Sequence, residues 1–233
     1  MNMTQTTMSR TILVWDLPTR AFHWLLAASF TGAFLTAESE RLRDVHVNFG
    51  YTLIGLIAFR ILWGLIGTRY ARFASFAFGP RRVLAYLGSI LRGGPEHHIG
   101  HNPAGSWAIY ALLLLGAAAG ASGLLTYNEF SGEWLAETHE ALANAMLGVV
   151  FVHLGGVVAS SLIHRENLAR TMLDGRKRGQ PSQGIRGART AVGVTLAAAV
   201  LAFWISQAAD PNPARPAPTR IAAHHGHHEH HER

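Results

Sequence analysis

The sequence of 233 residues contains no cysteine. This absence excludes thiolate metal sites, iron–sulfur clusters, structural disulfides and covalent haem attachment through a C-x-x-C-H motif. Acidic residues are scarce, with 14 Asp and Glu against 20 Lys and Arg, and only 15% of the chain is charged. The first twenty residues lack the apolar core and cleavage site of a signal peptide, so we expect the first apolar segment to remain in the mature protein.

Hydrophobic residues make up 49% of the chain and lie in long uncharged runs, which is typical of an integral membrane protein. The formal net charge is +6. The basic residues stand beside the apolar runs, where membrane proteins carry them. We therefore expect a lipid bilayer, and no nucleic acid, as the partner of these residues.

Five apolar segments approach the length of a membrane crossing, which is about 20 residues. They cover residues 20–37, 45–67, 104–126, 141–163 and 190–209. The first is short, and Asp16 followed by Pro18 is typical of a helix start just before it. The sequence predicts an all-α membrane protein with five transmembrane helices, the fifth of them C-terminal.

Basic residues are distributed unevenly over the predicted loops. They precede the first span and gather in residues 68–103 and 164–189, whereas residues 127–140 contain none. By the positive-inside rule, this distribution predicts a cytoplasmic N-terminus and an exported C-terminus. The loop before the fourth span is acidic, with Glu129, Glu133 and Glu137.

Two further regions lie outside the spans. In residues 80–92, apolar residues recur at helical spacing beside three arginines, which predicts either an amphipathic helix on the inner leaflet or a loop helix packed on the protein. Residues from Asp210 onward are proline-rich and are expected to be extended or disordered. Their end could bind zinc, copper or nickel through six histidines: His224, His225, His227, His228, His230 and His231.

Four histidines lie within or at the ends of the predicted spans: His23, His46, His139 and His153. Ionisable residues inside a membrane are costly and are candidates for function. His139 and His153 are fourteen residues apart, so they share one helix face and lie roughly 21 Å apart along its axis. With the predicted topology, His46 and His139 form an outer pair, and His23 and His153 form an inner pair.

A pair of imidazoles on facing helices supplies the two axial ligands of a haem b. Bis-histidine ligation leaves the iron no open position, so it favours electron transfer over activation of small molecules. Any one of these histidines could instead be a hydrogen-bonded interior residue, but two pairs matched in depth favour two haems. Arg60 and Arg20 are candidates for binding the propionates of the inner haem, although Arg60 could also extend to the inner interface.

A second group of histidines, His97, His98 and His101, precedes the third predicted span, where Asn102 and Pro103 are typical of a helix start. The group could form a proton relay beside a quinone site, or it could simply cap the helix and lie in solvent. His164 is similarly ambiguous. Several glycines within the spans could leave room for a flat haem or allow close helix packing: Gly50, Gly55, Gly120, Gly148, Gly155 and Gly156. Gly116 and Gly120 form a G-x-x-x-G pair, which is typical of close helix packing.

Four stretches carry a family resemblance: VWDLPTRAFHW, HVNFGYTLIGLIAFRILWGLIGTRYARF, GHNPAGS and ETHEALANAMLGVVFVHLGGVVASSLIHRENL. They resemble the bacterial cytochrome b561 family, and in particular the b-type cytochrome subunits of nickel–iron hydrogenases, over about residues 13–178. The resemblance implies a core in the form of a four-helix transmembrane bundle with two b haems, ligated by His23, His46, His139 and His153, that exchanges electrons with quinone in a bacterial inner membrane. We expect residues 1–178 to form this core, 179–209 the fifth helix with its cytoplasmic lead-in, and 210–233 an exported tail.

The function predicted from these features is electron transfer between the quinone pool and an exported redox partner such as a cytochrome c. One alternative is the membrane-anchor subunit of a nickel–iron hydrogenase. Another is a superoxide:quinone oxidoreductase, which the acidic outer loops disfavour, and a colourless metal transporter is a non-redox alternative. An electron-transfer subunit is favoured over a stand-alone enzyme, no catalytic residue is assigned, and a homodimer is left open.

Overall fold

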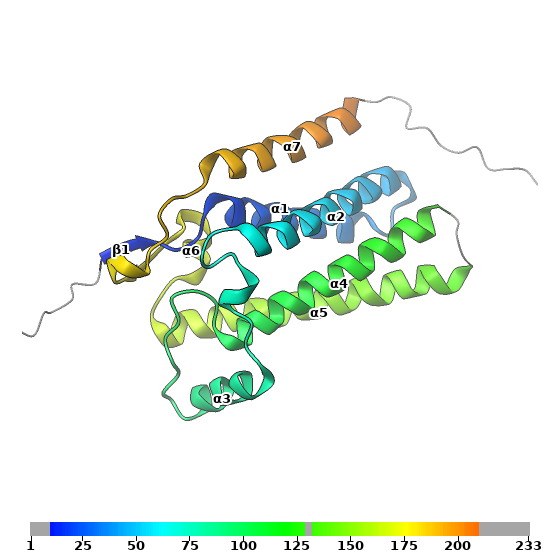
Figure 1. Ribbon diagram of the computed structural model, residues 1–233. Helices are drawn as coiled ribbons and strands as arrows, with labels where there is room; N and C mark the ends of the chain where they lie inside the picture. Colours follow the sequence, from blue (N-terminus) through cyan, green and yellow to red (C-terminus); the bar gives the residue numbers. More distant parts are fainter. Residues whose placement is uncertain (1–9, 129–131, 210–233) are drawn as a thin grey trace, which may run out of the picture.

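Five long helices form the body of the protein. The computed structural model describes residues 10–128 and 132–209, and its long helices are α1 (Leu17–Thr36), α2 (Arg43–Ile66), α4 (Pro103–Tyr127), α5 (Glu133–His164) and α7 (Thr190–Ala209). Helices α1 and α2 pack together, as do α4 and α5, and α2 joins the two pairs by packing on α4. Helix α7 lies against α1, on the far side of the bundle from α5 (Figure 1).

Four of these helices are long and apolar enough to cross a membrane. They are the α2 segment with its preceding turn (Glu40–Ile66), α4, α5 and α7. The segment predicted as the first span folds as α1, but α1 is not among these four helices because it is less apolar. Its first two turns contain Arg20 and His23, and Ser29, Thr31 and Thr36 follow. Its 20 residues nevertheless make it about 30 Å long, the thickness of a hydrocarbon core.

The helix starts follow the capping residues that the sequence predicts. The Asp16 side chain accepts a hydrogen bond of 2.8 Å from the Thr19 amide, and Pro18 lies in the first turn of α1. The Asn102 side chain likewise accepts from the Gly105 amide at 2.7 Å, at the start of α4. Both predicted starts are confirmed. Helix α5 begins eight residues before the predicted position 141, and its 32 residues extend for about 48 Å.

The all-α prediction misses a small sheet. Strand β1 (Arg10–Leu13) pairs antiparallel with β2 (Arg176–Gly179), so two segments far apart in the sequence meet at one end of the bundle (Figure 1). We call this end the sheet end. Ile12, Val14 and Trp15 form a buried cluster there, and helix α6 (Leu168–Asp174) leads into β2.

Helix α3 (Pro80–Leu91) lies beside the lower part of α4 (Figure 1). Val83 and Tyr86 are buried, whereas Leu84, Leu87 and Leu91 are exposed. One face of α3 therefore packs on the protein while a neighbouring face presents apolar side chains outward. The short segments η1 (Glu40–Leu42), η2 (Phe73–Ser75) and η3 (Pro181–Gln183) are single 3₁₀ turns in the connections.

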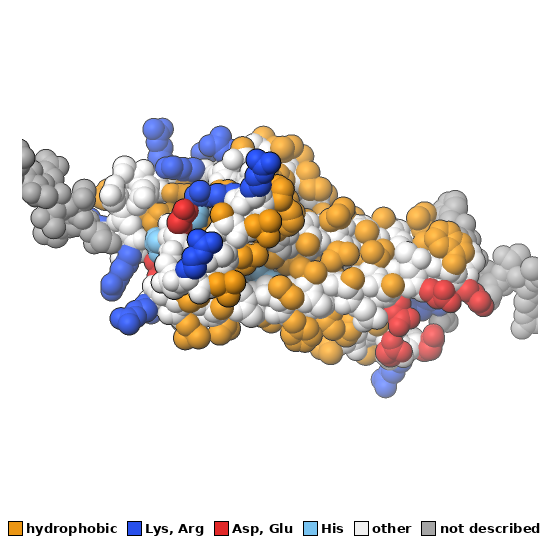
Figure 2. Space-filling view, turned by 90° about the horizontal axis from the view of Figure 1, so that it is seen from below, with side chains coloured by type: hydrophobic (Ala, Val, Ile, Leu, Met, Phe, Trp, Pro, Cys, Tyr) orange, Lys and Arg blue, Asp and Glu red, His pale blue; other side chains and the backbone are white. Residues whose placement is uncertain are grey.

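Charged side chains are separated along the length of the molecule. Figure 2 shows most Lys and Arg side chains at the sheet end and most Asp and Glu side chains at the opposite end, with hydrophobic side chains between them. We call the opposite end the acidic end; its carboxylates include Glu38, Glu40, Asp44, Glu133 and Glu137. Glu129 and the six tail histidines lie outside the described residues.

Candidate functional site

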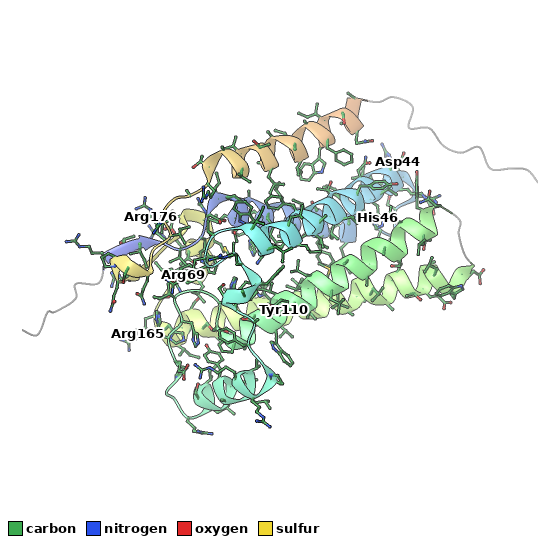
Figure 3. All side chains as sticks on the ribbon, viewed as in Figure 1. Asp44, His46, Arg69, Tyr110, Arg165 and Arg176 are labelled. Carbon is green, nitrogen blue, oxygen red and sulfur yellow. The ribbon has the colours of Figure 1, made fainter. Side chains whose placement is uncertain are left out.

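The outer pair meets near the acidic end of the bundle. The His46 ring on α2 and the His139 ring on α5 have centroids 6.0 Å apart and planes at 86°. Figure 3 shows His46 close to Asp44, whereas Arg69, Arg165 and Arg176 lie toward the sheet end. Two imidazoles bound to opposite sides of one iron hold their centroids about 6 Å apart, because each metal–nitrogen bond is about 2 Å long. The observed separation therefore fits a bis-histidine haem.

Backbone carbonyls orient both rings of the outer pair. Nδ1 of His46 lies 2.8 Å from the Ala33 carbonyl oxygen, and Nδ1 of His139 lies 2.9 Å from that of Ala119. A carbonyl oxygen can only accept a hydrogen bond, so Nδ1 is the donor in each ring. In a neutral imidazole, Nε2 then carries the free lone pair. This is the arrangement in which proteins present histidine to a metal.

A hollow of about 350 Å³ opens between α2, α4 and α5 at the outer pair. Its lining includes Gly50, Gly120 and Gly123 beside the two histidines. A Cβ on Gly50 would meet no atom within 4 Å, so this glycine leaves open space, whereas a Cβ on Gly120 would lie 2.5 Å from the Ile54 side chain. Room for a haem and close helix packing, the two interpretations of the glycines, thus apply to different positions. Open space surrounds Gly50, Gly55, Gly148, Gly155 and Gly156, and close packing surrounds Gly116 and Gly120.

The inner pair lies toward the sheet end. His23 on α1 and His153 on α5 are within electrostatic reach of each other. The His23 ring packs edge-on against Trp24 with centroids 5.0 Å apart, and its Nδ1 is buried without a hydrogen-bond partner. Within the described residues, neither ring of the inner pair makes the contact with a backbone carbonyl that orients each ring of the outer pair.

Arg60 is buried near the start of α1, where its guanidinium carbon lies 6.0 Å from the ring centroid of Phe22, the residue before His23. Its side chain is only 3% exposed, so it does not extend to the interface. The guanidinium carbon lies 4.8 Å from the centroid of Phe73 and 5.8 Å from that of Phe76, and Nη1 has no hydrogen-bond partner. Arg20 instead reaches α6, where Nη1 donates to the Leu173 carbonyl, although its Nε is also buried without a partner.

The family model described as prokaryotic cytochrome b561 matches residues 14–175. The chain belongs to this family. It is therefore a multi-pass membrane protein of the b-type cytochromes, which carry haem b and serve electron transport.

Two curated relatives share this family likeness. The chain is 26% identical over 212 residues to a protein of Azotobacter vinelandii described as a probable Ni/Fe-hydrogenase B-type cytochrome subunit, covering 70% of this chain and 87% of the relative. It is 24% identical, with the same coverage, to a protein of Azotobacter chroococcum mcd 1 with the same description. No solved structure matches the chain.

His101 and His97, which are not members of either pair, lie in different environments. The ring of His101 lies between Trp15 and Phe76, with centroids 4.6 and 4.4 Å away, and its Nδ1 is buried without a partner. Burial lowers the pKa of His101, and nearby Arg60 lowers it further. The reading of His101 as a solvated capping residue is therefore wrong, because Asn102 caps α4 and the ring packs between two aromatic side chains.

His97 belongs to a polar cluster at the sheet end that the sequence did not reveal. Glu166 accepts from His97 Nε2 at 3.0 Å and from Lys177 Nζ at 3.1 Å. Lys177 is buried, with a side chain 4% exposed, and it also contacts the His98 carbonyl oxygen at 3.3 Å. The His164 ring lies 5.3 Å from that of His97. These residues line a second hollow of about 280 Å³.

Proposed function

We propose that the protein binds two b haems and transfers electrons through a membrane between the quinone pool and an exported redox partner. His46 and His139 would hold the outer haem, and His23 and His153 the inner haem. The observation that carries this proposal is the outer pair, whose rings lie 6.0 Å apart and whose Nδ1 atoms both donate to backbone carbonyls.

When bound, haem b would supply a one-electron carrier. The protein's own residues would hold that carrier and restrict its chemistry. Two histidine ligands leave no position for a substrate, so the site favours electron transfer. The carbonyls of Ala33 and Ala119 fix the two outer imidazoles before any metal arrives, which lowers the reorganisation needed on binding. The four histidines come from one chain, so neither site needs a homodimer.

We place the protein in a bacterial inner membrane, with the sheet end in the cytoplasm and the acidic end in the periplasm. The separation of basic and acidic side chains in Figure 2 supports this orientation. In this arrangement α1 is a fifth crossing, since it has the length of a hydrocarbon core and packs along α2. Its polar first turns would lie at the cytoplasmic surface, and α3 would rest its apolar face on the inner leaflet.

The exported partner is proposed to be a basic redox protein such as a cytochrome c. Figure 2 shows carboxylates gathered at the acidic end, where Figure 3 places His46, and they would attract a positively charged protein over a long range. The same charge would repel superoxide, which disfavours a superoxide:quinone oxidoreductase. The second candidate is the anchor subunit of a nickel–iron hydrogenase, which the descriptions of both Azotobacter relatives favour.

The haem content of the natural protein and of two histidine variants tests the proposal. The purified chain should carry two haems, and His139→Ala and His153→Ala should each retain one. The two remaining haems should differ in spectrum and midpoint potential, since one variant keeps the inner site and the other the outer site. A colourless protein would refute haem binding and favour metal transport. Loss of the same haem in both variants would refute the pairing.

The partner is tested by isolating the protein from its own membranes. Co-purification with a large soluble hydrogenase would favour the anchor subunit. Salt-sensitive electron transfer to a basic cytochrome c, without such a subunit, would support the favoured function. Reoxidation of the reduced haems by a soluble quinone analogue tests the quinone step, and its absence in detergent and in liposomes would refute that step.

A further inference from the structure

Unpartnered polar atoms concentrate around the inner pair. Within residues 10–128 and 132–209, six buried side-chain nitrogen or oxygen atoms have no hydrogen-bond partner. Three of them are His23 Nδ1, Arg60 Nη1 and His101 Nδ1, and His23 is itself a proposed ligand. Burying a polar group without a partner is unfavourable, so two such donors beside one site indicate a ligand group that accepts from them.

Arg60 lacks an anion to balance its charge. No carboxylate of the described residues lies within ion-pair distance of it. Asp16 attracts it from farther away, but the Asp16 oxygens are already occupied. Oδ1 accepts from the Thr19 amide at 2.8 Å, and Oδ2 accepts from Trp63 Nε1 at 3.1 Å and Thr68 Oγ1 at 2.6 Å. Arg60 is thus a buried cation available for an anion from outside the chain.

Arg60 and His101 converge on the same side chain. The Phe76 centroid lies 5.8 Å from the Arg60 guanidinium carbon and 4.4 Å from the His101 centroid. Both Arg60 and His153 act electrostatically on His101. The two donors therefore lie close together beside one member of the inner pair, although they come from α2 and from the loop before α4.

We propose that Arg60 and His101 together bind a propionate carboxylate of the inner haem. This inference rests on the proposed function, because it requires a haem at His23 and His153. A carboxylate accepts a hydrogen bond from each donor and also neutralises the guanidinium, which a neutral acceptor such as a quinone carbonyl would not do. The aromatic rings of Phe73 and Phe76 exclude water from this contact and so strengthen it.

Redox titration of the purified, haem-loaded chain tests the proposal. Arg60→Gln should lower the midpoint potential of the inner haem, because loss of the cation leaves the propionate charge unbalanced and favours ferric iron. We expect at least a tenfold change in the ratio of oxidised to reduced inner haem, which is about 59 mV for one electron. His101→Phe should cause a smaller shift in the same direction while keeping an aromatic ring between Trp15 and Phe76. The outer haem should not change.

Arg69→Gln is the matched control, since it removes the same charge from an exposed arginine at the same end (Figure 3). Equal shifts of both haems, or an Arg60→Gln shift no larger than the control, would overturn the proposal. If Arg60→Gln does not fold, His101→Phe decides: an unchanged inner potential overturns the proposal.

A chemical counterpart uses the apoprotein reconstituted with haem b or with its dimethyl ester. Esterification removes both propionate charges, so it should weaken binding at the inner site of the natural protein by more than tenfold and should have a much smaller effect in Arg60→Gln. Equal effects of the ester in both proteins would overturn the proposal. A natural chain that binds no haem at all would instead refute the proposed function, so the two failures are distinguishable.

Discussion

Gly123 controls the position of the His139 ring, so a single methyl group at this residue tests the outer site. A Cβ built on Gly123 lies 2.9 Å from Cε1 of His139 and 3.1 Å from its Nδ1. Ordinary carbon contacts lie at about 3.5 Å. In Gly123→Ala the ring must therefore move by about 0.5 Å, and it must do so against the hydrogen bond of 2.9 Å to the Ala119 carbonyl.

A displacement of this size is large for a metal ligand, because binding groups must be held within about 0.5 Å of the productive geometry. Overpacking of this kind costs about 1–3 kcal/mol. If the cost falls on the ligated state, haem affinity at the outer site decreases by about 5- to 150-fold, since each 1.4 kcal/mol is a factor of ten. The inner site is roughly 21 Å away along α5 and should retain its affinity.

The assay measures haem content per chain while the protein is diluted or while a competing apoprotein removes haem. A redox titration distinguishes the two haems. Gly88→Ala is the control, because it adds the same methyl group to a helical glycine of α3, away from both histidine pairs, and the added Cβ meets only the end of the Arg92 side chain at 3.4 Å. Unchanged outer-haem affinity and potential in Gly123→Ala would refute the assignment of His139 as an oriented ligand. Equal loss of both haems would show a general folding defect instead.

Three further predictions concern stability and are measured by thermal unfolding in detergent. Asp16→Ala should destabilise the fold by about 2–4 kcal/mol, because the fully buried carboxylate accepts three hydrogen bonds and caps α1; a loss below about 1 kcal/mol would contradict this. Burial alone would raise the pKa of Glu166, but Lys177 and His97 together have the larger effect and hold that pKa below its usual value. Glu166 therefore contributes stability above its unfolded pKa that is lost as the pH falls through its folded pKa, so Glu166→Gln should be less stable than the natural protein at neutral pH and equally stable in acid. A difference in stability between Glu166→Gln and the natural protein that does not change with pH would contradict a stabilising Glu166–Lys177 ion pair. Gly193→Leu should cost about 1–3 kcal/mol without haem loss, since a Cβ there lies 2.6 Å from the Leu17 side chain; haem loss would show that α7 supports the core.

Local patterns in the sequence predicted much of the helical body. Asp16 and Asn102 mark helix starts because capping depends only on neighbouring residues. The shared face of His139 and His153 follows from helix periodicity alone. The approach of His46 to His139 was predicted from topology, and the structure brings their rings to 6.0 Å.

Features built from distant segments could not be predicted in this way. The strands β1 and β2 have four residues each and lie far apart in the sequence, and the sequence Arg-Lys-Arg-Gly of β2 has no strand pattern. The burial of His101 depends on Trp15 and Phe76, which the chain brings from two other segments. The carbonyls that orient the outer histidines belong to alanines, whose side chains give no signal.

The spacing of His139 and His153 along α5 has an electrical consequence. An electron that moves between the two pairs is displaced by roughly 21 Å along the helix, which is about two thirds of a hydrocarbon core of about 30 Å. Moving one charge across the whole core against 100 mV requires about 2.3 kcal/mol, so this step involves about 1.6 kcal/mol per 100 mV. The membrane voltage would therefore drive or oppose electron transfer between the pairs. The fourteen-residue spacing of His139 and His153 determines the size of this effect.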